Sequence, residues 1–208
     1  MKRILAFTIA TILSVLGIAL TSCSTLGDNI CELRDSVYKA QTDNLQVWAY
    51  SGKRETVYKI DGKPTTSHNY FMVVVQGVFE SAPIVKIKVD QNEYEQVGNK
   101  HPFNDEYLFE FKQNINADQV NATICIGNQA QEIVLVKEPK EFLSYASALS
   151  IAKKEIKSVQ NYEIIARIIE NPIAHDGQYF WYIAFCKSET DVKSVLIDKD
   201  GNVVAKSE

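Results

Sequence analysis

The sequence of 208 residues has few of the features that identify an enzyme or a nucleic-acid-binding protein. Its three histidines, His68, His101 and His175, are far apart, lie in expected loops and form no H-x-x-x-H or H-E-x-x-H pair. The motifs G-x-S-x-G and C-x-x-C and a glycine-rich phosphate loop are absent. Its 22 basic residues are outnumbered by 26 acidic ones and form no cluster, which argues against nucleic acid as a partner. We therefore expect no catalytic residues, no metal site and no cofactor.

Two short motifs resemble functional ones but lack their partners. Residues 150–153 spell S-x-x-K, as in penicillin-binding proteins, without the S-D-N and K-T-G motifs that complete that site. Asp198 to Asn202 begin like a calcium-binding loop, but the sixth position is Val203 instead of glycine. We interpret the first motif as helix surface and the second as a turn. A hydrolase assembled from scattered residues is the least favoured functional hypothesis.

Long apolar runs are also scarce, and the only one stands at the N-terminus. Lys2 and Arg3 precede an apolar stretch from Ile4 to Leu20, the layout of a secretory signal. A transmembrane helix is the alternative, because the run approaches the length of a bilayer span. Small and acidic residues follow the run, however, where a stop-transfer segment would have positive charges. The run ends in Leu20-Thr21-Ser22-Cys23, which resembles the lipobox of bacterial lipoproteins.

The lipobox resemblance implies that the protein is located at a membrane. It implies cleavage of a signal peptide, residues 1–22, and lipidation of Cys23 with acyl chains such as palmitate, which together anchor a protein stably. The expected location is the extracytoplasmic face of a bacterial cell membrane, or the outer membrane where the cell has two. The alternative is an ordinary signal with an incidental cysteine. Removing residues 1–22 leaves 186 residues with 20 basic and 26 acidic side chains.

Three further cysteines, Cys31, Cys125 and Cys186, remain in that mature chain. An odd number excludes a fully paired intramolecular framework, and their spacing matches no metal motif. Cys125 and Cys186 lie in strand-like runs. We expect small buried hydrophobic residues in preference to a disulfide.

The next two segments are predicted to be a tether and a β domain. Residues 23–35 are interpreted as a lipid-anchored tether, in which Asn29 and Glu32 have the spacing of a capping box for a short helix. Residues 36–138 contain seven or eight short β runs separated by turn residues, which predicts an immunoglobulin-like β-sandwich, with a small barrel as the alternative. Among these runs are TVYKI, the doubly buried NYFMVVVQGVF, and the alternating IVKIKV and EYLFEFK.

Residues 139–208 predict a small α+β domain after a boundary at Glu138-Pro139-Lys140. Ser144 is a plausible N-cap for an amphipathic helix between Phe142 and Val159. Its expected apolar stripe consists of Ala146, Leu149, Ala152, Ile156 and Val159. Three strands follow, YEIIARIIE, QYFWYIAFCK and VKSVLID, and then a short NVVAK. A helix laid over one face of that sheet would close the α-β-β-β unit.

This C-terminal segment resembles a PepSY domain. The resemblance rests on the helical SALSIAKKEI, on the aromatic strand from Tyr179 to Ile183, and on Asp198, Gly201 and Val203 in the last hairpin. Cystatin-like and nuclear-transport-factor-like units share the same order of elements. The PepSY resemblance implies a binding or inhibitory module, sometimes linked to the control of peptidases, with no catalytic residues to carry over.

The aromatic strand supplies the candidate binding surface. Tyr179, Trp181, Ile183 and Phe185 alternate with Phe180, Tyr182 and Ala184, so both faces are large and apolar. A helix covers only one face of a sheet. The other face therefore packs on the first domain or binds a partner. We take the face with Tyr179, Trp181, Ile183 and Phe185 as the candidate.

These observations favour a non-enzymatic, lipid-anchored envelope protein that binds a protein or peptide partner, with regulation of an extracytoplasmic peptidase as one form of that role. A structural lipoprotein with a β-sandwich spacer is the alternative.

Overall fold

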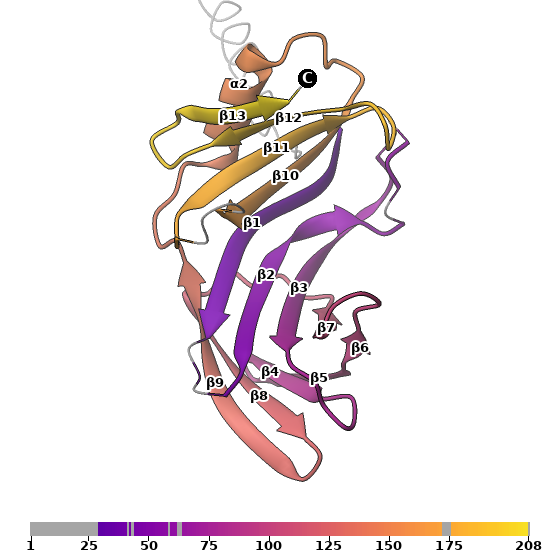
Figure 1. The fold of residues 1–208 in the computed structure, drawn as a ribbon, viewed down its shortest axis with the longest axis vertical. Helices are drawn as coiled ribbons and strands as arrows, with labels where there is room; N and C mark the ends of the chain where they lie inside the picture. The colour runs from indigo at the N-terminus through magenta and orange to yellow at the C-terminus, as the bar shows by residue number, and fades with distance from the viewer. Residues whose placement is uncertain are drawn as a thin grey trace, which may run out of the picture.

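The computed structural model describes residues 29–40, 42, 44–57, 59–61, 64–171 and 176–207. It is mainly β, with one helix among these residues, which confirms the expected class. Cys23 and the expected signal peptide lie outside the described residues. The strands form one hydrogen-bonded sheet that curls strongly through the molecule (Figure 1).

The first nine strands form a nearly closed antiparallel unit. In space their order is β5-β4-β8-β9-β1-β2-β3-β7-β6, and β5 approaches β7 across the remaining gap. The expected sandwich of two separate sheets is not confirmed, because these strands belong to one curled sheet. Their bounds are β1 Ile30–Ala40, β2 Gln46–Glu55, β3 Ser67–Gln76, β4 Ile84–Val89, β5 Asn92–Val97, β6 Asn99–Lys100, β7 Glu106–Phe111, β8 Gln119–Ile126 and β9 Gln129–Glu138.

Alternation along the strands fills the interior of this unit. Tyr107, Phe109 and Phe111 of β7 point inward and are buried, as the alternation predicts. Phe71 and Val73 of β3 face Phe111 and Phe109 across the ladder. This first core also takes residues from β1, β2, β4, β8 and β9. Burial of this apolar surface is the main stabilising term for the unit.

Two local expectations for this half are wrong, and one strand was missed. Residues 30–34 form the start of β1, not a tether with a short helix, because they hydrogen-bond to strands on both sides and bury Leu33. Pairing with distant strands outweighs the local capping signal. The described residues of TVYKI do not belong to a strand: β2 ends at Glu55, and the chain bends at Thr56 and Val57. β5 was not expected, because its sequence NEYEQV is polar.

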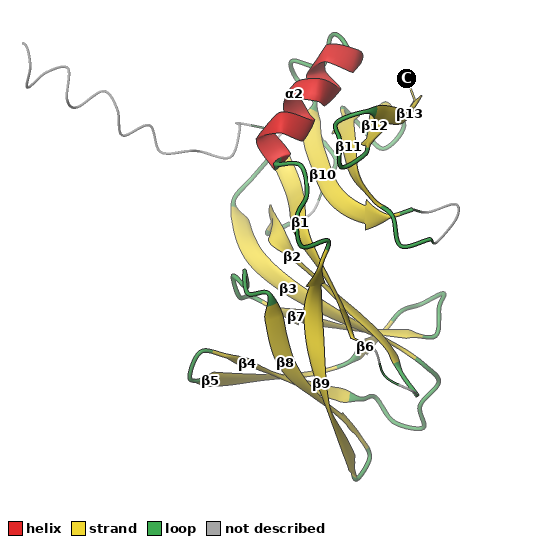
Figure 2. Ribbon diagram, turned by 90° about the vertical axis from the view of Figure 1, so that its left-hand side faces the viewer, coloured by secondary structure: helices red, strands yellow, loops and turns green. Residues whose placement is uncertain are grey.

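The C-terminal half places helix α2, Tyr145–Glu155, over one side of a sheet (Figure 2). Ser144 caps the helix, as expected, by accepting the N–H of Ser147. Ala148 and Ala152 are its buried residues, and the expected Ala146 is exposed. Ala148 and Ala152 are four residues apart, so they face the sheet together. The strands that follow are β10 Glu163–Glu170, β11 Tyr179–Cys186, β12 Val192–Ile197 and β13 Val203–Ser207.

Strand β1 belongs to both halves. Its first part, Ile30 to Arg34, pairs in parallel with β10, and its last part, Val37 to Lys39, pairs with β9. A register shift between Arg34 and Ser36 separates the two parts. The expected boundary at Glu138 to Lys140 falls between β9 and α2. The C-terminal sheet is therefore completed by a strand from the other end of the described chain.

Candidate functional site

The four residues expected to form a binding surface lie in the core. Trp181, Ile183 and Phe185 are at most 1 % exposed and Tyr179 is 9 % exposed. Helix α2 and the segment before it cover this face, and Trp181 Nε1 donates a hydrogen bond to the Leu143 carbonyl at 2.7 Å. The predicted surface is thus wrong, because the candidate face is the one that the helix covers.

The opposite face of β11 is covered as well. Ala184 and Cys186 pack with Cys31 and Ile165 in a second, smaller buried cluster, and Ile60 packs against it. Cys31 comes from β1 and Ile60 from the link between β2 and β3, so the first half of the chain covers this face. Of the two interpretations of the aromatic strand, packing between the two halves is the one the geometry supports.

A cluster of charged and polar side chains from β1, β10 and β3 surrounds Glu32. Glu32 is 4 % exposed and accepts hydrogen bonds from Arg167, from Arg34 at 3.3 Å and from the Tyr70 hydroxyl at 3.0 Å. Burial alone would raise the pKa of Glu32, but the two guanidinium groups and the Tyr70 hydroxyl outweigh it and lower that pKa. Glu32 is therefore held as a carboxylate between two arginines.

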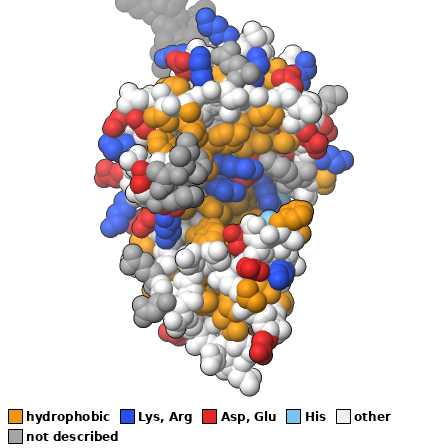
Figure 3. Space-filling model, viewed as in Figure 1, with side chains coloured by type: hydrophobic (Ala, Val, Ile, Leu, Met, Phe, Trp, Pro, Cys, Tyr) orange, Lys and Arg blue, Asp and Glu red, His pale blue; other side chains and the backbone are white. Residues whose placement is uncertain are grey.

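A second ion pair continues this charged region along β2 and β3. Arg54 and His68 both contact the Glu110 carboxylate, with His68 Nε2 at 3.1 Å, and Arg54 lies over the Tyr70 ring. His68 was expected in a loop but is part of β3. His101 lies in a loop, where it accepts the N–H of Phe103, and His175 lies outside the described residues. The face drawn in Figure 3 is hollowed across its middle, and basic side chains lie there among hydrophobic ones.

An open groove runs along the outer side of β1 and β2, beside the end of β10. Its volume is about 700 Å³. The side chains of Trp48 and Tyr50, both half-buried, alternate with residues of the first core, so they face away from that core. The groove, as we name it, is lined by Arg34, Val37, Lys39, Ala40, Thr42, Leu45, Gln46, Val47, Trp48, Tyr50, Gln76, Ile169 and Glu170.

The polar groups of the groove are held in place by their neighbours. Arg34 lies over the Tyr50 ring with 4.0 Å between its guanidinium carbon and the ring centroid. Lys39 Nζ is 2.9 Å from the Glu170 carboxylate. Gln46 and Gln76 face each other across the β2–β3 ladder. The lining thus combines aromatic rings and amides with two cations and one carboxylate, and Arg34 also contacts the carboxylate of Glu32. Such a surface suits a ligand with a peptide-like backbone and a negative group.

Sequence reasoning missed the groove because its residues come from four strands, β1, β2, β3 and β10, and from the link between β1 and β2. One signal was present: LQVWAYS has bulky residues on both faces, and only one face of a barrel strand is inside.

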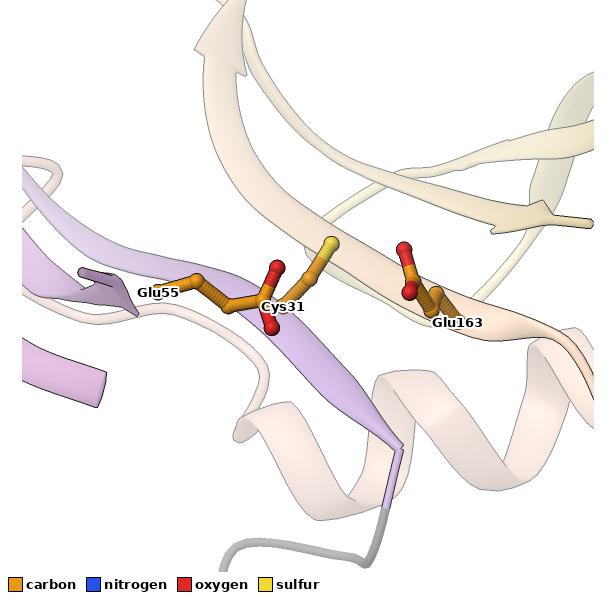
Figure 4. Close-up of side chains that lie close together, drawn as sticks. All are labelled: Cys31, Glu55 and Glu163. Carbon is orange, nitrogen blue, oxygen red and sulfur yellow. The ribbon is translucent and has the colours of Figure 1, made fainter. Parts of the chain in front are cut away.

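A third group of chemically active residues is buried near the start of β1. Cys31 Sγ and one carboxylate oxygen each of Glu55 and Glu163 lie within 4.8 Å of one another (Figure 4). All three residues are at most 2 % exposed. Burial, together with these two carboxylates, raises the pKa of the Cys31 thiol to about 12. No sequence motif links the three residues, since β1, β2 and β10 each supply one of them.

The remaining sequence expectations are tested by local contacts. Asp198 Oδ1 accepts the N–H groups of Asp200 at 2.9 Å and Asn202 at 2.8 Å, which confirms the turn. Cys31, Cys125 and Cys186 are free thiols, and Cys31 and Cys186 are buried as expected. Cys125 is only partly buried.

Among the described residues, no helix is long and apolar enough to cross a bilayer. No protein-family model, curated protein or solved structure matches the chain.

Proposed function

We propose that this protein is a non-enzymatic envelope lipoprotein, anchored through lipidated Cys23, that binds an acidic, extended peptide segment of a partner protein in the groove. The observation that carries the binding role is the lining of the groove: Trp48 and Tyr50 beside Arg34 and Lys39. Aromatic rings provide contact area at low entropic cost, and guanidinium groups bind carboxylates with paired hydrogen bonds.

The charges of the groove indicate the charge of the ligand that it binds. The chain has a formal net charge of −4, yet the groove has Arg34 and Lys39 against the single carboxylate of Glu170. Lys39 pairs with Glu170 and Arg34 pairs with Glu32, so an acidic ligand would share these two cations with the carboxylates that they already contact. A positive groove on a negative protein favours an anionic ligand over a neutral or basic one.

The C-terminal half supports a regulatory form of the same role. Helix α2 followed by four antiparallel strands has the element order of a PepSY-like module, which we propose this half to be. Modules of that kind are associated with the control of peptidases, and a groove that holds an extended peptide suits such control. The fold's dependence on β1 distinguishes this unit from a self-contained module.

The binding proposal is tested with two matched fluorescent peptides, one alternating Glu and Leu and one alternating Lys and Leu. The acidic peptide should bind the purified chain, as measured by fluorescence anisotropy, and the basic one should not. Arg34→Gln and Trp48→Ala should each weaken binding, while Val204→Ala, a change at an exposed position of β13, should not. Equal binding of both peptides, or full binding by Arg34→Gln, would contradict the proposal.

The anchor is tested separately by detergent partitioning of the expressed chain. Wild-type protein should enter the detergent phase and Cys23→Ala should remain in the aqueous phase, because the acyl chains supply the membrane affinity. A Cys23→Ala protein that still enters detergent would refute the anchor without affecting the groove.

A further inference from the structure

The buried group around Cys31 has the composition of a metal site. Cys31 on β1, Glu55 at the end of β2 and Glu163 at the start of β10 direct one thiol and two carboxylates toward a common point (Figure 4). We propose that Cys31, Glu55 and Glu163 bind a divalent metal ion, and that the ion is Zn²⁺.

The donor atoms select the metal. Calcium and magnesium bind oxygen ligands and have little affinity for sulfur, whereas zinc accepts thiolate and carboxylate together. In a four-coordinate zinc site the ligand atoms lie about 3.5 Å from one another, as zinc–ligand bonds of about 2.0–2.3 Å require. The three donor atoms here are all within 4.8 Å, so small side-chain rotations bring them to that spacing. Three protein ligands leave a fourth position for water or another ligand.

The backbone around Cys31 supports the proposal independently of the donors. Ile30 pairs with Ile164 and Glu32 pairs with Ile165, so Cys31 is an additional residue on β1 and forms a bulge in the parallel ladder. Bulges redirect a side chain and are common beside functional sites. Here the bulge brings the Cys31 thiol toward the side chain of Glu163. The Glu55 carboxylate accepts the N–H of Thr65, which fixes its orientation.

Charge gives the metal a structural role. Two carboxylates brought together away from water repel each other, and a divalent cation offsets that repulsion. Zinc binds the thiolate form of cysteine, so the ion must displace the Cys31 proton on binding. The ion would join three strands that come from both halves of the chain.

The test is a titration of the full chain, purified in the presence of a chelator, with Co²⁺ as a spectroscopic probe for Zn²⁺. One equivalent of Co²⁺ should produce a thiolate-to-cobalt charge-transfer absorption, and Zn²⁺ should abolish it by displacement. Cys31→Ser should remove the absorption. Cys125→Ser, which removes a thiol on β8 outside the group, should preserve it. Glu163→Gln should weaken metal binding by more than about tenfold. A loss of about that size is typical even for a residue that only hydrogen-bonds to a metal ligand.

Thermal unfolding provides a second readout. Zn²⁺ should raise the unfolding midpoint of the wild type and of Cys125→Ser, because it binds the folded state, and should not raise that of Cys31→Ser. A folded wild-type chain without the cobalt–thiolate absorption would overturn the proposal, as would an absorption that survives Cys31→Ser. The titration of the wild type tests the proposal even if one of the variants fails to fold. Peptide binding in the groove does not depend on this outcome, so the two proposals fail separately.

Discussion

Strands β2 and β11 both have tryptophan and tyrosine at alternate positions, and both lie in the middle of the sheet, yet they differ in what covers them. In β11, Trp181 is 1 % exposed beneath α2, and the opposite face packs on residues from the first half of the chain. In β2, one face is inside the first core, and on the other face Trp48 and Tyr50 line the groove, with Tyr50 also packed against the core beneath α2. An aromatic strand is a binding surface only where no second layer covers it.

The largest expected effect separates the two tryptophans. Trp181→Ala should lower the free energy of unfolding by about 3–5 kcal/mol, because it leaves a cavity under α2 and an unpaired Leu143 carbonyl. Trp48→Ala should cost about 1 kcal/mol or less, because its side chain is only half-buried. Urea unfolding of both variants measures the difference. Similar losses for the two substitutions would show that Trp48 is also core.

A comparison of β11 with β4 and β7 shows which features the sequence predicts and which it does not. Strands with clear alternation, such as β4 and β7, were predicted as strands, and Ser144 was identified as the cap of α2. These features are local, because alternation and capping involve neighbours in sequence. Which layer covers which face is not local, and the interpretation of β11 depended on that layer.

Residues 30–34 and β5 show a second limit of prediction from the sequence. The first segment was expected to be a tether with a short helix, on the capping-box spacing of Asn29 and Glu32, but it buries Leu33 by pairing with β10. β5 is paired only to β4, and such an edge strand tolerates the polar side chains that concealed it. The group of Cys31, Glu55 and Glu163 could not be predicted from the sequence, for the same reason as the groove. Its residues come from three strands that are brought together only by the fold.

The second prediction concerns Glu32, on the strand that lies between β2 and β10. Arg167→Met should cost about 2–3 kcal/mol at neutral pH, because it removes one cation from a buried carboxylate and leaves Arg34 and Tyr70. The pKa of Glu32 is lowered in the folded state, so its interactions stabilise the protein above the usual pKa of glutamate. That stability is lost as the pH falls through the lowered pKa.

The difference between wild type and Arg167→Met should therefore shrink in acid. Urea unfolding at a series of pH values measures it, with Arg167→Lys as the matched control that keeps the positive charge. A difference that stays constant down to strongly acidic pH would mean that Arg167 acts by packing and not through Glu32.

The third prediction tests how β2 is held against β1. A Cβ atom at Gly52 would lie 2.0 Å from the Leu33 carbonyl oxygen, which is a backbone atom and has little freedom to move. Gly52→Ala should therefore separate the two strands and cost about 1–3 kcal/mol. Lys53→Ala, on the next residue of the strand, is the control and should change stability by about 0.5 kcal/mol or less. Equal thermal midpoints for the two variants would exclude tight packing at Gly52.

The smallest effect is expected at the turn that joins β12 to β13, at the edge of the sheet that buries β11. Asp198→Ala removes an acceptor for the N–H groups of Asp200 and Asn202 and should cost about 0.5–1 kcal/mol. Hydrogen bonds from the Asn202 side chain and from the turn backbone lower the pKa of Asp198, so the contribution of this carboxylate should disappear as the pH falls through that pKa. Asp200→Ala is the control, because Asp200 is exposed and its ion pair is with the adjacent Lys199. Hydrogen exchange of the β13 amides should increase in Asp198→Ala alone, and protection of β11 should remain, because the core beneath α2 does not depend on this turn.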